Sequence, residues 1–193
     1  MNNSSLDFIK LLIKYGADVN AKNGNDVLPI YVVSERKNLN LDLIKTLVNA
    51  GADINAKNYL GHTLLYTSCE RNDIEIVKFL LKNGADVNER NEKTYSDSNE
   101  ETPLYVSCWN GYTDLVKLLV KSGADVNAKI GNGNTPIEAC YGRNSLISLD
   151  IVKCLVENGA DVKNVKLTYI KNKDIKDYIK EVKNIIKTKS GRK

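Results

Sequence analysis

The sequence predicts an all-α protein in which helix-turn-helix units stack one after another. A six-residue segment ending in Gly-Ala-Asp-Val/Ile-Asn recurs, with Lys in place of Asn the last time. Its glycines are Gly16, Gly51, Gly84, Gly123 and Gly159, so successive copies lie 35, 33, 39 and 36 residues apart. A period of about 33 residues is typical of units that bury their apolar faces only against their neighbours.

The second helix of each unit is the amphipathic stretch in front of the glycine. In residues 73–82 and 114–121, apolar residues recur at helical spacing and lysines occupy the other side. Glycine then ends the helix, because it adopts the left-handed conformation most readily. The first helix begins at Thr102 and Thr135, each followed by Pro, which suits a first helical turn. We expect the Asp and Asn after the glycine to hydrogen-bond their own turn and the next unit.

These residues resemble the ankyrin-repeat family, in which Thr-Pro-Leu-His begins the first helix and Gly-Ala-Asp-Val-Asn follows the second. The resemblance covers residues 6–163 and implies an ankyrin-repeat solenoid with projecting β-turn fingers. It also implies binding of a partner protein through the fingers and the concave face of the first helices. The His position of the family holds Tyr31, Tyr66, Tyr105 and Glu138. Small-residue positions, where the family favours Ala, hold Cys69, Cys108 and Cys140, which predicts a packing role for these thiols.

We divide the chain into units of one continuous domain. Residues 1–20 supply only the second helix of a partial repeat, residues 21–55, 56–88, 89–127 and 128–163 are full repeats, and residues 164–193 are a basic C-terminal cap. The cap is expected to pack through a stripe made of Ile175, Tyr178, Ile179, Val182, Ile185 and Ile186. The partial repeat leaves an apolar edge on its helix, so self-association through this helix is one open interpretation.

Composition argues against several classes of protein. No apolar run in the 193 residues approaches the roughly 20 that a membrane helix needs. The four cysteines form no CxxC pair and His62 is the only histidine, so we expect no metal site, no cofactor and no enzyme. The polar start and the reduced thiols favour the cytoplasm. Residues 187–193 offer a nuclear signal as the alternative.

The expected partner surface combines first-helix ends with fingers. Trp109 falls at a non-core position at the end of a first helix, and the family resemblance places it on the concave face. The alternative is that Trp109 lies flat over a neighbouring helix and only covers the core. Turn 89–101 carries five acids against two bases, which predicts an extended acidic finger or, alternatively, a solvated loop. The expected contact residues are Tyr59, Leu60, His62, Glu70, Arg71, Glu100, Glu101, Tyr105, Trp109, Asn110, Tyr112 and Arg143.

The leading functional interpretation is a non-catalytic protein–protein interaction module that serves as an adaptor or effector. The alternative assigns the activity to the basic tail, which would bind nucleic acid or an anionic membrane surface through its charge. Residues 163–193 hold eleven Lys/Arg and three Asp/Glu, a net charge of +8. Only Tyr169 and Tyr178 are available there for stacking on bases, so nucleic acid is the less favoured partner.

Overall fold

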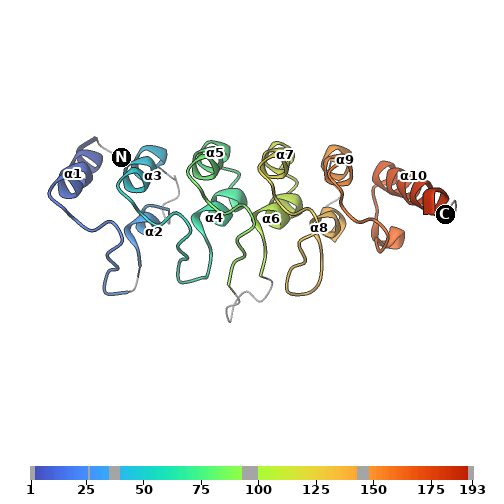
Figure 1. Ribbon diagram of the computed structural model, residues 1–193, viewed down its shortest axis with the longest axis horizontal. Helices are drawn as coiled ribbons and strands as arrows, with labels where there is room; N and C mark the ends of the chain where they lie inside the picture. Colours follow the sequence, from blue (N-terminus) through green and yellow to red (C-terminus); the bar gives the residue numbers. More distant parts are fainter. Residues whose placement is uncertain (1–2, 26, 35–39, 93–99, 143–147, 191–193) are drawn as a thin grey trace.

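The computed structural model describes residues 3–25, 27–34, 40–92, 100–142 and 148–190. Its helices form two rows (Figure 1). The second helices form the upper row: α1 (Asn3–Lys14), α3 (Leu41–Asn49), α5 (Ile74–Lys82), α7 (Thr113–Lys121) and α9 (Leu149–Glu157). The first helices lie below: α2 (Pro29–Ser34), α4 (Leu64–Glu70), α6 (Pro103–Asn110) and α8 (Pro136–Gly142). A 3₁₀ turn, η1 (Leu167–Tyr169), and α10 (Lys173–Ser190) complete the stack.

The predicted all-α architecture is confirmed. In the described ranges the only pairing of β type is an isolated bridge between Lys57 and Thr63. Each of the predicted full repeats contains one first helix and one second helix, although the repeat boundaries themselves stay predictions. None of the helices in these ranges has both the length and the apolar character that crossing a membrane requires.

Helix ends follow from particular side chains. Thr63 and Thr102 cap α4 and α6, because each hydroxyl accepts a hydrogen bond from the backbone N–H three residues on, at 3.1 and 3.2 Å. Beyond α5, Gly84 has a φ of 90°, a left-handed conformation that side chains disfavour. The chain then turns back, and Ala85 N–H donates to the Leu80 carbonyl at 3.0 Å.

The core lies between the two rows of helices. The same three positions of α3, α5, α7 and α9 are at most 4% exposed: Leu43, Ile44, Leu47, Ile76, Val77, Leu80, Leu115, Val116, Leu119, Ile151, Val152 and Leu155. Cys69, Cys108 and Cys140 are at most 1% exposed in the first helices, which confirms their packing role. Burial raises the pKa of the Cys69 thiol to about 12.

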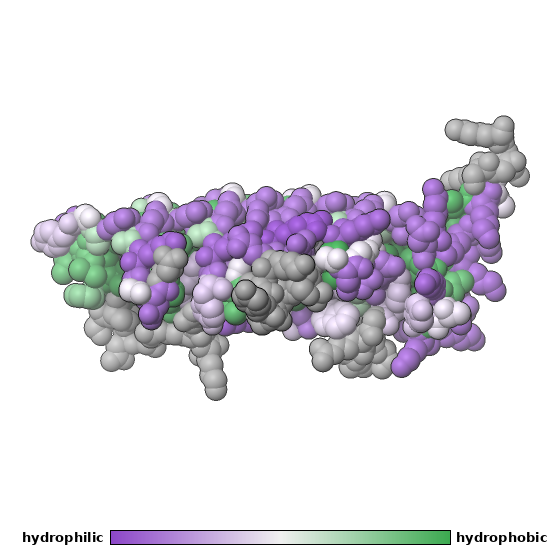
Figure 2. All heavy atoms as spheres, turned by 90° about the horizontal axis from the view of Figure 1, so that it is seen from below, coloured by the Kyte–Doolittle hydropathy of each residue, from purple (hydrophilic) through white to green (hydrophobic). Residues whose placement is uncertain are grey.

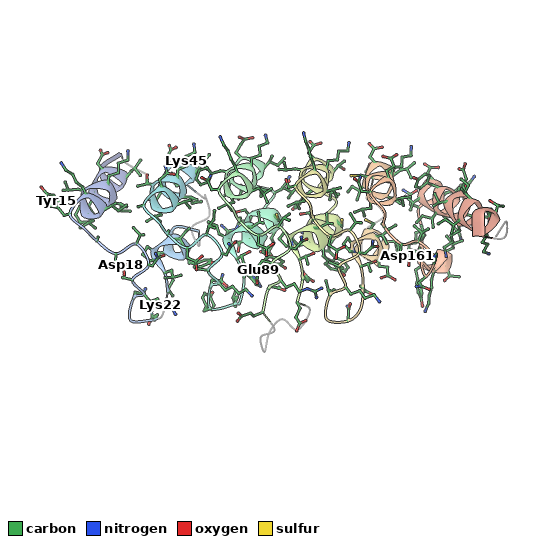
Figure 3. All side chains as sticks on the ribbon, viewed as in Figure 1. Tyr15, Asp18, Lys22, Lys45, Glu89 and Asp161 are labelled. Atoms are coloured by element: carbon green, nitrogen blue, oxygen red, sulfur yellow. The ribbon has the colours of Figure 1, made fainter. Side chains whose placement is uncertain are left out.

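A row of asparagines joins each unit to the next. The Asn127 amide donates to the Gly159 carbonyl at 2.9 Å and accepts from the Asp161 N–H at 2.8 Å. Asn20, Asn55 and Asn88 make the same pair of bonds to their own following units. The repeated aspartates accept from the N–H two residues on, as at Asp18 and Asp161, which mark the first and last of these turns (Figure 3). Both expectations for these residues are confirmed.

The cap ends the row differently. Lys163 takes the Asn position, and the Lys183 ammonium donates to the Lys163 and Val165 carbonyls at 3.0 and 2.7 Å. Ile175 and Ile179 of α10 are at most 1% exposed. The predicted cap stripe is wrong in one member, since Ile185 is 46% exposed. The reason is its direction on the helix, because Ile186, one residue further along and about 100° around α10, is half-buried and packs against the core.

Candidate partner-binding surface

The loops between the rows project below the first helices as fingers (Figure 1). In the finger before α4, the Asn58 side chain accepts from the N–H groups of Leu60 and His62, at 3.0 and 2.9 Å, and so fixes a tight turn. Tyr59 is 70% exposed at this turn, whereas Leu60 and His62 are half-buried. The His62 ring lies 4.6 Å from the Tyr66 ring. Tyr59 is therefore the residue that this finger presents to solvent.

Neighbouring fingers hold each other through charged groups. The Lys57 ammonium lies 2.7 Å from a Glu89 carboxylate oxygen and 3.5 Å from one of Glu92. Figure 3 labels Glu89 between the fingers. Burial alone would lower the pKa of Lys57, but the hydrogen bonds and charges of the two glutamates raise it above its ordinary value. Glu89 and Glu92, at the base of the predicted acidic finger, therefore both form ion pairs with Lys57 of the same chain. The finger's tip, residues 93–99, lies outside the described residues.

Tyrosines at the family's His position connect first helices to the following finger. The Tyr66 hydroxyl donates to the Glu101 carboxylate at 2.8 Å, and the Tyr31 hydroxyl donates to the Ala56 carbonyl. Glu100 and Glu101 are both half-buried at the start of α6. Tyr105 is only 3% exposed, so its expected role as a partner contact is corrected to packing. A side chain buried under its own repeat has no surface to offer a partner.

The ends of α4 and α6 form one continuous surface, which we call the helix-end patch: Glu70, Arg71, Trp109, Asn110 and Tyr112. Glu70, Arg71 and Asn110 are exposed, while Trp109 and Tyr112 are half-buried. The Tyr112 hydroxyl reaches the Glu70 carbonyl at 3.5 Å, which joins the two helix ends. Five predicted contact residues therefore share one surface.

Trp109 packs on its own helix. Its ring is stacked over that of Tyr105, one turn earlier on α6, with centroids 6.3 Å apart and planes inclined by 19°. This stacking concerns only its own helix, so the alternative, in which Trp109 lies flat over a neighbouring helix, stays a prediction. The ring nevertheless remains half-buried rather than buried. The indole packs against the core in part and is partly exposed.

Sequence reasoning missed a pocket between α8 and the cap. It measures about 560 Å³ and is lined by Asn134, Glu138, Tyr141, Lys166, Thr168, Tyr169 and Lys171. The Lys166 ammonium lies 5.7 Å from the centre of the Tyr169 ring. The Glu138 carboxylate accepts from both the N–H and the hydroxyl of Thr135, at 2.9 and 3.1 Å. The η1 turn follows no repeat pattern, so the only available signal was a lysine-rich composition.

Comparison with models of protein families tests whether the resemblance of this chain to ankyrin repeats is more than chance. A model of ankyrin repeats, present in three copies, matches residues 1–91, 30–130 and 89–166. The chain belongs to the ankyrin-repeat family. Ankyrin repeats are generally protein–protein interaction modules, and the family is typically non-catalytic. A search of curated proteins found no match.

In this ankyrin-repeat chain eight of the twelve predicted contact residues fall into two groups at opposite ends of α4. Tyr59, Leu60 and His62 precede the helix, and the helix-end patch begins where it ends. Seven helical residues separate the groups by about 10 Å. Arg143, another expected contact residue, lies outside the described residues. A partner that contacts both groups must therefore span the length of α4.

Side chains of metal-binding type occur along the part of the chain that the structure describes. Across the described ranges, no group of three or more His, Cys, Asp or Glu residues is placed to hold a metal ion. The four cysteines are unpaired thiols, and Cys154 is the one that is partly exposed.

Proposed function

We propose that the chain is a non-catalytic recognition module, an adaptor or effector, that binds a partner protein through the helix-end patch and the finger at Tyr59. The observation that carries this proposal is the half-buried Trp109, stacked on Tyr105 at the end of α6, where Tyr112 bonds the end of α4 that carries the exposed Glu70 and Arg71. Trp and Arg are the residues most enriched where single side chains dominate binding energy. Here both sit on helix ends held by a buried core, so little ordering entropy is lost on binding.

The patch also suggests what the partner contributes. Trp109 offers an apolar surface on which an aliphatic or aromatic side chain packs. Arg71 and Glu70 stand beside it with opposite charges and orient a partner that carries complementary charges. The unpaired thiols support a reducing, cytoplasmic location for this activity.

The test is affinity capture from cell lysate at physiological salt, with three forms of the chain. The native chain is compared with Arg71→Ala/Trp109→Ala and with a matched control on the second helix α5, Phe79→Ala/Lys82→Ala. Phe79 is half-buried like Trp109, and Lys82 is exposed like Arg71. We expect the patch variant to capture at most about a tenth of the partner that the native chain captures. The control should capture as much as the native chain. Equal capture by all three forms, with unchanged melting, contradicts the proposal. Tyr59→Ala tests the finger separately.

The basic cap supports a second, less favoured candidate. The lysines exposed on α10 include Lys173, Lys176, Lys180 and Lys187, whereas Lys183 is used to bind carbonyls of the cap. Binding of an anionic membrane or nucleic acid through them would weaken steeply as salt increases. Capture that is insensitive to salt argues against this candidate.

A further inference from the structure

Helix α1 exposes positions that the other second helices bury. Aligned on the glycine that follows each helix, Phe8, Ile9 and Leu12 correspond to the three core positions of α3, α5, α7 and α9. Those core residues are at most 4% exposed, whereas Phe8 is 59% and Leu12 is 43% exposed. In the other repeats the first helix of the same unit covers these positions, whereas none of the described residues forms a first helix against α1.

The exposed side chains form one stripe. Phe8, Leu11, Leu12 and Tyr15 are 59, 48, 43 and 79% exposed. With about 100° between successive residues, all four fall within an arc of about 100°. Tyr15 points away from the stack at its outer end (Figure 3), and the space-filling view shows an apolar surface at the same end (Figure 2). Contiguous apolar surfaces of this kind mark interaction sites.

We propose that this stripe, the α1 edge, pairs with the α1 edge of a second copy of the chain, with the two helices antiparallel. The stripe is self-complementary in its spacing. A two-fold axis between Leu11 and Leu12 places Phe8 of each copy opposite Tyr15 of the other copy. A two-fold interface requires such self-complementarity. Burial of the four apolar side chains of each copy supplies the driving force.

Charge favours a second copy over an unrelated apolar surface. Asp7 and Lys14 are both exposed, and helical geometry puts them on the same side of the stripe, about 20° apart, with one near each end. In an antiparallel pair this side of one helix faces the same side of the other. Asp7 therefore faces Lys14 of the second copy, and Lys14 faces its Asp7. A parallel pair lacks this match.

The opposite end of the stack argues against a head-to-tail arrangement. There α10 covers α9, with Ile175 and Ile179 buried. Its outer surface carries the exposed Lys173, Lys176 and Lys180. Pressing the α1 edge against these lysines would desolvate charges without partners, which is costly. The association consequently closes as a dimer and does not continue as a filament.

Sedimentation equilibrium over a concentration series from about 1 to 300 µM tests the pairing. We expect the native mass to rise from that of one chain towards that of two. Leu11→Glu should weaken the dimer about a hundredfold, because each copy would bury a carboxylate against apolar side chains. The matched control is Ile185→Glu on α10, at 46% exposure against 48% for Leu11, and it should leave the dimer intact. A single-chain mass throughout, a dimer that survives Leu11→Glu, or equal loss in both variants overturns the proposal.

Charge reversal tests the antiparallel orientation. Asp7→Lys and Lys14→Asp each convert both cross-pairs into like-charge pairs and should weaken the dimer about tenfold at low salt. The double variant restores opposite charges and should recover the native dissociation constant. Because both residues are exposed in the single chain, thermal melts at high dilution should be unchanged. Failure of the double variant to recover overturns this arrangement.

Discussion

At the scale of the residue, the asparagine that follows each glycine turn joins one repeat to the next. Asn88 donates to the Gly123 carbonyl at 3.2 Å and accepts from the Asp125 N–H at 2.8 Å. Asn88→Ala removes both bonds, so we expect the free energy of unfolding to fall by about 1–2 kcal/mol. Urea denaturation followed by circular dichroism measures this change.

Two matched substitutions separate the inter-repeat bonds from a general effect of losing asparagine. The Asn83 amide bonds only the Phe79 carbonyl of its own helix, at 2.7 Å, so Asn83→Ala should cost about half as much as Asn88→Ala. Lys163 occupies the same position as Asn88 at the end of the row, where no asparagine bridge forms. Lys163→Asn should therefore leave stability within about 0.5 kcal/mol of the native value. Equal costs for Asn88→Ala and Asn83→Ala would refute the bridging role.

Buried thiols make stability depend on pH in the alkaline range. Burial raises the pKa of Cys69 to about 12, while an unfolded thiol ionises near pH 8.5. The folded pKa is the higher one, so this contribution to stability is complete below about pH 8.5 and is lost as pH rises towards 12. Above pH 9 the free energy of unfolding of the native protein should fall with pH. In Cys69→Ala this slope should be less steep, by up to about 1.4 kcal/mol per pH unit. Urea midpoints between pH 7 and 10.5 measure the slopes, and identical slopes in both proteins contradict the assignment.

At the scale of the element, the finger turns are held by close backbone contacts. Gly61 has a φ of 74°, and a Cβ there would meet the Cβ, N and Cα of Glu92 at 2.6, 2.9 and 3.0 Å. Gly61→Ala must therefore displace the next finger. We expect a loss of about 2–4 kcal/mol, which adds the backbone penalty to the cost of overpacking. Thermal unfolding measures the loss.

The chain supplies its own control for this substitution. Gly133 ends the same kind of turn in another finger, with a φ of 87° and an N–H that bonds the Ile130 carbonyl at 2.8 Å. A Cβ at Gly133 would have no neighbour within 4 Å, so Gly133→Ala carries only the backbone penalty of about 1–2 kcal/mol. If both variants lose the same stability, the finger before α4 is not fixed by its contact with Glu92.

Which elements could be predicted depends on whether their cause repeats along the chain. Helix ends, glycine turns and the asparagine row follow from local chemistry that recurs at each unit, so one sequence suffices to place them. Tyr105 was placed wrongly, because its burial comes from packing inside the stack, as it does for Tyr31 and Tyr66 at the same position of their own repeats, and the residue type alone does not show it. The pocket beside Lys166 and Tyr169 was missed for a related reason, since the cap occurs once and provides no second copy for comparison.

At the scale of the whole molecule, the two ends of the stack are unequal. In a solenoid each unit contacts only its neighbours, so a terminal unit loses half of its cover unless a cap replaces it. Helix α10 performs this role at one end, where Ile175 and Ile179 are buried. At the other end the α1 edge stays exposed. The two ends of the described stack therefore differ, since Ile175 and Ile179 are buried at one end and Phe8 and Leu12 are exposed at the other.

This inequality predicts how substitutions at the ends act on the whole stack. Ile179 belongs to the cap helix α10 and is fully buried. Ile179→Ala should therefore lower the free energy of unfolding by about 2–4 kcal/mol and open the C-terminal end of the stack first. Ile185→Ala, on the same helix but 46% exposed, should cost less than about 0.5 kcal/mol. Native-state hydrogen exchange resolves the location. In Ile179→Ala the amides of α10 and α9 should exchange faster while those of α5 keep their protection, because coupling passes only between neighbouring units. Uniform loss of protection from α3 to α9 would show that the stack unfolds as one cooperative body and that the cap stabilises all of it equally.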